Sequence, residues 1–93
     1  MLHLKRYLSG TRLSLAEFQL FATTHKLTER EMDICSLIMN GYSNQGICEQ
    51  LFIEKSTVKT HITNILSKTH CNSRFQLLQR ILNLKGFHYE SEK

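Results

Sequence analysis

Apolar residues recur at every third or fourth position through most of this chain, which is the spacing of amphipathic helices. The pattern is sharpest between residues 56 and 69, where one face carries Val58, Ile62, Ile65, Leu66 and Thr69. The opposite face carries Ser56, Lys59, Thr60, Thr63 and Ser67. No carboxylate lies between Lys55 and Lys68, so this face can lie against a polyanion without electrostatic repulsion.

Capping boxes mark helix starts: a serine or threonine and a glutamate or glutamine three residues later satisfy free amides of the first turn. The pattern occurs at Ser14–Glu17, Thr28–Glu31 and Ser73–Gln76, and Ser43 is a further candidate cap. Glycine at Gly41 and Gly86 supplies the stop signal after a last turn. Together these signals predict helices over residues 15–24, 28–40, 44–51, 55–69 and 74–84.

The short helix over 44–51, the tight turn Phe52–Glu54 and the helix that follows have the spacing of a helix-turn-helix. Gly46 falls inside the short helix, where glycine costs about 1 kcal/mol relative to alanine. Either this glycine allows a close backbone approach or it simply weakens the helix. Residues 1–12 give no clear signal.

Composition supports a small, all-helical, basic domain. The chain has 93 residues, no proline and a net charge of +4, with a pI of about 9.2. The surplus of basic residues is unevenly distributed along the chain. Residues 27–53 carry one cation and four acids. Residues 54–85 carry the single acid Glu54 against Lys55, Lys59, Lys68, Arg74, Arg80 and Lys85. A basic surplus on and after the acid-free helix suits a nucleic-acid partner.

Other classes of protein have little support in the sequence. The three cysteines form no CxxC pair and are expected to be buried or half-buried free thiols in a reducing cytoplasm. The histidines and cysteines lack metal-ligand spacing, and there is no glycine-rich phosphate loop, so we expect no metal, no cofactor and no enzyme activity. No apolar run approaches the roughly 20 residues of a membrane span. A cytoplasmic protein with no membrane partner is therefore expected.

The order of several motifs resembles a known family. The motifs are Leu27-Thr28-x-Arg30-Glu31, Gly41-Tyr42-Ser43-Asn44 and Thr57-Val58-Lys59-x-His61-x-x-Asn64-Ile65, followed by Lys68 and Arg74. Over residues 27–84 and without a gap, the chain resembles the LuxR/FixJ/NarL-type (GerE-like) C-terminal helix-turn-helix domain of bacterial transcription regulators.

The resemblance implies an all-α, four-helix domain of the winged-helix-like superfamily without the wing, here with an extra N-terminal helix. It divides the chain into an N-terminal arm and helix (1–26), the DNA-binding domain (27–84) and a tail (85–93). Relatives usually carry an upstream receiver or ligand-binding domain, which 26 residues cannot encode. The expectation is therefore either a stand-alone regulator or a piece of a longer protein.

Three departures from the family pattern affect the predicted DNA-binding region and its surroundings. Gln45–Gly46 stands where relatives have a charged pair, and Glu54 stands where a serine usually caps the recognition helix. Thr69 and Cys71 replace the usual leucine and valine after that helix. Glutamate is the weaker side-chain cap, although its charge suits the positive end of the helix dipole.

The family implies sequence-specific binding to double-stranded DNA, with the helix over 55–69 in the major groove. The adjacent Lys59, Thr60 and Thr63 are predicted to reach base edges, with Lys59 carrying most of the direct readout. The alternative for Lys59 is a phosphate contact only. Contacts to the DNA backbone are predicted for Ser43, Asn44, Gln45, Ser56, Thr57, His61, Asn64 and Lys68. Ser43 equally suits a capping role, Thr57 and Asn64 structural hydrogen bonds, and His61 a role in orienting its neighbours.

The last helix is expected to supply the dimer interface, through Leu77, Leu78 and Ile81. Glu31 is expected to pair with Arg74 where the first and last family helices meet. The expected assembly is a homodimer, or a heterodimer with another regulator, and RNA polymerase is a further candidate partner. The rival interpretation is an interaction protein that pairs with another regulator or antagonises it, through the last helix and the face of Leu15, Phe18 and Phe21.

Overall fold

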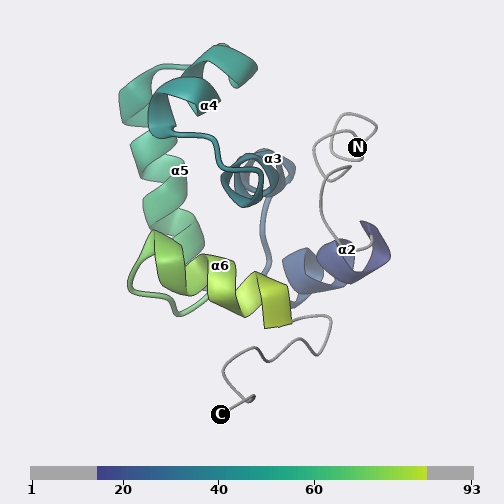
Figure 1. Cartoon of the computed structure of the whole chain (residues 1–93). Coiled ribbons are helices and arrows are strands. Elements are labelled where there is room, and N and C mark those ends of the chain that lie inside the picture. Colours follow the sequence, from purple (N-terminus) through teal and green to yellow (C-terminus); the bar gives the residue numbers. More distant parts are fainter. Residues whose placement is uncertain (1–14, 84–93) are drawn as a thin grey trace.

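The fold is all-helical, as the sequence predicts. The computed structural model describes residues 15–83, which contain α2 (Leu15–Thr24), α3 (Glu29–Met39), α4 (Asn44–Leu51), α5 (Lys55–Lys68) and α6 (Arg74–Leu82) and no strand. The predicted cap at Ser14, the helix end at residue 84 and the stop at Gly86 lie outside the described residues. Figure 1 shows α3 end-on at the centre, with α2 on one side, α4 and α5 on the other and α6 beneath.

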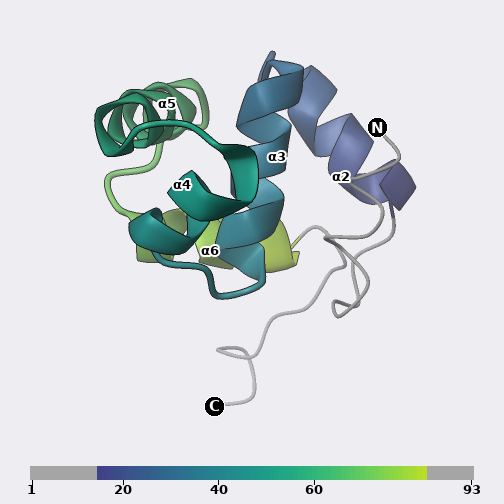
Figure 2. The same ribbon diagram turned by 90° about the horizontal axis from the view of Figure 1, so that it is seen from above.

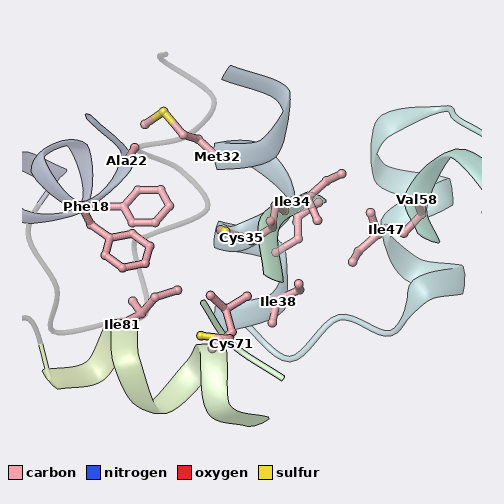
Figure 3. Close-up of a cluster of buried hydrophobic side chains, with 14 of the residues drawn as sticks. Phe18, Ala22, Met32, Ile34, Cys35, Ile38, Ile47, Val58, Cys71 and Ile81 are labelled. Atoms are coloured by element: carbon pink, nitrogen blue, oxygen red, sulfur yellow. The ribbon is translucent and has the colours of Figure 1, made fainter. Parts of the chain in front are cut away.

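The central helix α3 is buried almost all round. Every residue from Glu31 to Ile38 is buried, which few surface helices permit. Its apolar side chains face the neighbouring helices on both sides, and Figure 3 shows them between Phe18 and Ile81 on one side and Ile47 and Val58 on the other. Because α3 touches this single core throughout, it fixes where the flanking helices can lie.

The N-terminal helix α2 belongs to the same core. Phe18, Phe21 and Ala22 are buried there, and the two phenyl rings stack with their centroids 6.5 Å apart. Helix α2 therefore packs in the same core as the helices that follow residue 27.

The predicted caps form, with one difference. At α3 the box is complete: the Glu31 amide donates to Thr28 Oγ1 over 3.1 Å and the Thr28 amide to Glu31 Oε1 over 2.9 Å. At α6 the Gln76 amide donates to Ser73 Oγ, but the Gln76 side chain accepts from the amide of Asn72 instead of Ser73. The reciprocal half of that predicted box is wrong by one residue.

Turns and cysteines also follow expectation. Gly41 has a φ of +87° after α3, and Phe52 ends α4 in the left-handed conformation with a φ of 58°. At Gly46 an added Cβ would lie 3.1 Å from a ring carbon of Tyr42, which supports the close-approach interpretation of this glycine.

The three cysteines are free, with Cys35 and Cys71 buried and Cys48 half-buried. Burial, with the nearby Glu31 and Cys71, raises the pKa of Cys35 to about 12, so its thiol is inert at neutral pH.

Candidate nucleic-acid interface

Helix α5 is held by one face and exposed along the other. Val58 and Ile65 are buried, with Ile62 and Leu66 packed beside them, and the helix contacts both α3 and α4. Figure 2 shows α5 at the edge of the molecule, on the far side of α3 from α2. The exposed residues of α5 contain no acid: Lys55, Ser56, Thr57, Lys59, Thr60, Thr63, Asn64 and Ser67.

The three predicted base-contact residues share this exposed face. Lys59, Thr60 and Thr63 lie within little more than one turn of α5, and all three side chains are exposed. The Thr60 hydroxyl donates to the backbone oxygen of Ser56 over 3.1 Å. This bond uses the hydroxyl proton, so Thr60 offers an outside partner its methyl group and a lone pair.

The start of α4 carries the predicted contacts of the short helix. Ser43 caps it by accepting from the Gly46 amide over 3.1 Å, which confirms the capping alternative. The Gln45 side chain donates to Glu49 over 3.0 Å, one turn along the same helix. The Asn44 side-chain oxygen accepts from Arg74, so Arg74 pairs with α4 and the predicted Glu31–Arg74 pair is wrong.

Two predicted DNA-backbone residues on α5 turn toward the protein. Lys68 Nζ lies 2.8 Å from Glu31 Oε1 and 3.1 Å from the backbone oxygen of Lys26. His61 is half-buried, and its Nδ1 is enclosed without a hydrogen-bond partner. The position of Lys68, three residues after the buried Ile65, is the signal in the sequence that it lies toward the core face.

Glu31 is a buried carboxylate that anchors the end of α5. Burial alone would raise the pKa of Glu31, but hydrogen bonds from Lys68 and the Thr28 amide, with the charges of Lys68 and His61, lower it below its ordinary value of 4.5. The carboxylate therefore stays ionised through the neutral range. It holds the N-terminus of α3 to the C-terminus of α5.

Replacing Glu31 with glutamine should lower stability by about 1–2 kcal/mol at neutral pH, because a charge-assisted hydrogen bond is removed. A carboxylate with a lowered folded-state pKa contributes stability above its unfolded value and loses it as pH falls through the folded value. The gap in melting temperature between wild type and Glu31→Gln should therefore close below about pH 4.5. Glu29→Gln, at an exposed acid of the same turn, is the control. A constant gap down to pH 2 would contradict the ion pair.

The apolar residues of α6 are divided between the core and the surface in a way that differs from the prediction. Leu77 is 0% exposed and Ile81 is 1% exposed, so both are buried in the core of a single chain. Leu78 is half-buried. The exposed apolar side chains of α6 are Phe75 at 66% and Leu82 at 47%.

Helices α4 and α5 and the turn between them form a helix-turn-helix, and the exposed face of α5 has no acid. The sequence profile described as "Bacterial regulatory proteins, luxR family" matches residues 25–81. The chain belongs to this family. Family membership makes it a DNA-binding regulatory domain and not an enzyme.

Several regulators are similar to this luxR-family chain. A transcriptional regulatory protein DegU of Brevibacillus brevis is 39% identical over 67 residues, which cover 72% of the chain and 28% of the relative. LiaR of Bacillus subtilis and the response regulator VraR of Staphylococcus aureus are each 56% identical over 50 residues, covering 54% of the chain and 24% of the relative. The chain thus spans about a quarter of the length of these curated relatives. No solved structure gives a significant match.

Among residues 15–83, no helix has the length and apolar character needed to cross a membrane.

The start of α5 departs from the usual family pattern. Glu54, at the position of the usual capping serine, is the N-cap of α5 but makes no side-chain hydrogen bond to it. The first turn of α5 therefore has a negative charge beside it and no side-chain cap.

Changing Glu54 to serine should increase stability by at most about 1 kcal/mol, because a serine cap replaces a charge that only favours the helix dipole. It should also strengthen DNA binding, since an exposed acid is removed beside the candidate interface. Glu54→Ala separates the two effects: affinity should rise equally, while urea-induced unfolding shows no gain in stability. A lower DNA affinity in both variants would contradict this account of Glu54.

Proposed function

We propose that this domain binds double-stranded DNA sequence-specifically as a dimer, with α5 in the major groove, and thereby regulates transcription. Helix α5 follows α4 at the spacing of a helix-turn-helix, and its exposed face has no acid. This observation supports the proposal most strongly. A phosphate backbone is repelled by carboxylates, and this face presents lysines, hydroxyls and an amide.

The proposed base contacts come from the middle of α5. The Lys59 ammonium can donate to guanine O6 and N7, which face the major groove. Thr60 directs its hydroxyl proton to Ser56, so its methyl group is the better candidate to contact a thymine methyl. Thr63 adds a second short side chain. With one long reader and two threonines, we expect modest direct specificity supplemented by DNA shape.

Phosphate contacts are proposed at two helix starts. Asn44 and Gln45 with the Ser43 cap lie at the start of α4, and Ser56 and Thr57 lie at the start of α5. Helix N-termini favour phosphates, because free amides and the dipole both point toward the anion. Asn64 is exposed farther along α5. In this proposal Lys68 and His61 orient α5 from beneath it.

Dimerisation is proposed through the exposed side of α6, with Phe75 and Leu82 around the half-buried Leu78. Two copies related by a two-fold axis would place two α5 helices on half-sites about 34 Å apart, one turn of DNA. A heterodimer with another regulator would use the same side. RNA polymerase is a further proposed partner of the bound dimer.

The test is selection of bound duplexes from random DNA, followed by titration of the selected duplex at several salt concentrations. We expect two inverted half-sites, and an affinity that falls by about 10³-fold or more between 50 and 200 mM salt if six or more phosphates are contacted. A lone half-site would contradict the symmetric dimer. A demonstrated dimer that binds no duplex would support the rival interpretation, a partner or antagonist of another regulator.

A further inference from the structure

Arg74 connects the proposed dimer helix to the proposed DNA-contacting helix. As the first residue of α6, it reaches across to the start of α4, thirty residues earlier in the chain. Its Nη1 donates to Asn44 Oδ1 over 2.7 Å, and its Nη2 donates to the backbone oxygen of Tyr42. The guanidinium is partly buried in both contacts, so the two arms of one rigid fork hold the loop and the first residue of α4 together.

The contact with Asn44 fixes the orientation of a carboxamide. A guanidinium carries only donors, so the Asn44 atom that faces it must be the oxygen. The amide nitrogen Nδ2 consequently points away from Arg74. Within residues 15–83 no hydrogen bond from this nitrogen to another residue is found, and the Asn44 side chain is partly exposed. A preoriented donor thus lies at the positive end of a helix.

The second arm holds the backbone beside this donor. The Tyr42 carbonyl immediately precedes Ser43, the cap of α4. This bond ties the loop before α4 to the start of α6. The Asn44 side chain therefore keeps one orientation relative to α6.

We infer that Arg74 is a positioning residue for DNA binding: it holds the Asn44 carboxamide with Nδ2 directed toward a phosphate of the bound duplex. The inference rests on the proposed function and deepens it. Arg74 acts through Asn44 and does not touch DNA. Arg74 is followed directly by Phe75, which lies on the proposed dimer side of α6.

The experiment uses the full chain and the selected duplex, and measures affinity over a series of salt concentrations. Arg74→Ala and Arg74→Lys should each weaken binding by about ten-fold, the effect of one lost hydrogen bond to a charged phosphate. Arg74→Lys keeps the charge, so its salt slope should equal that of the wild type, but a single ammonium cannot reproduce the two-armed geometry. Arg80→Ala, which removes a cation elsewhere on α6, should leave the affinity close to the wild-type value.

A double variant decides whether Arg74 acts through Asn44. Asn44→Ala should show the same decrease in affinity, and Arg74→Ala combined with Asn44→Ala should bind no more weakly than Asn44→Ala alone. Additive effects would mean that Arg74 contacts DNA itself, and would overturn the inference. So would unchanged affinities in variants whose circular dichroism shows a folded protein, because Arg74 would then be structural only.

Failure of the proposed function is distinguishable from failure of this inference. A wild-type chain that binds no duplex at any salt concentration would overturn both. A wild type with steep salt dependence and Arg74 variants of equal affinity would overturn the inference alone. If Arg74→Ala does not fold, Arg74→Lys and Asn44→Ala give the same comparison.

Discussion

Replacing Lys59 with alanine is expected to abolish the preference of this domain for its selected site over unrelated DNA. Lys59 is the only long side chain among the three proposed base readers, and a good lysine–guanine contact contributes about 1–3 kcal/mol of discrimination. The change corresponds to a ten- to hundred-fold fall in the specific affinity, which is the whole of the modest direct specificity proposed here. Competition between the selected duplex and a scrambled duplex measures it.

Lys55→Ala is the matched control for that experiment. It removes the same charge from the exposed start of the same helix. Removing a cation at this position, away from the proposed base contacts, should weaken binding to selected and scrambled duplexes equally, with a lower salt slope. If Lys59→Ala behaves like Lys55→Ala and the preference survives, another residue reads the bases.

Truncating Leu77 to alanine should cost about 2–5 kcal/mol of stability, because a fully buried leucine leaves a cavity. Small domains have only about 5–15 kcal/mol in total, so the variant should unfold at much lower urea concentrations. Leu82→Ala, at an exposed position of the same helix, is the control. It should keep its urea midpoint while the dimer dissociates at higher protein concentrations in sedimentation experiments.

The reverse result would favour a dimer face that includes Leu77. A Leu77→Ala chain with unchanged stability and a weakened dimer would mean that Leu77 faces a second copy. An intact dimer in both variants would move the interface away from α6. The pair of measurements thus separates packing within one chain from packing between two.

Local signals predict the helices well, because caps and stops depend on residues a few positions apart. The complete box of Thr28 and Glu31 and the left-handed Gly41 are examples. The apolar arc of α6 is also recognisable in the sequence, but periodicity alone does not tell which part of a wide arc faces the chain's own core. For this reason the sequence proposes Leu77 and Ile81 as interface residues, while the structure buries both in the core of a single chain.

Polar pairs between distant helices are the part that sequence reasoning misses. In the sequence, Glu31 has two candidate cationic partners. Lys68 lies at the end of α5, and Arg74 follows α5. Only the packing of α3 against α5 brings Lys68 within 2.8 Å. The contact between Arg74 and Asn44 joins residues that have no local relationship in the chain. Such pairs depend on the tertiary arrangement of the helices, which local spacing does not encode.

The buried position of α2 sets a limit on exchanging this domain between proteins. The family profile begins at residue 25, so a hybrid regulator joined at that point would lack Phe18, Phe21 and Ala22. Their absence would expose apolar surface on α3 and α6. The hybrid protein should therefore aggregate or have a lower melting temperature. A transplantable unit must include α2 (Leu15–Thr24), and a regulator that received it would acquire the binding specificity of α5 only together with this helix.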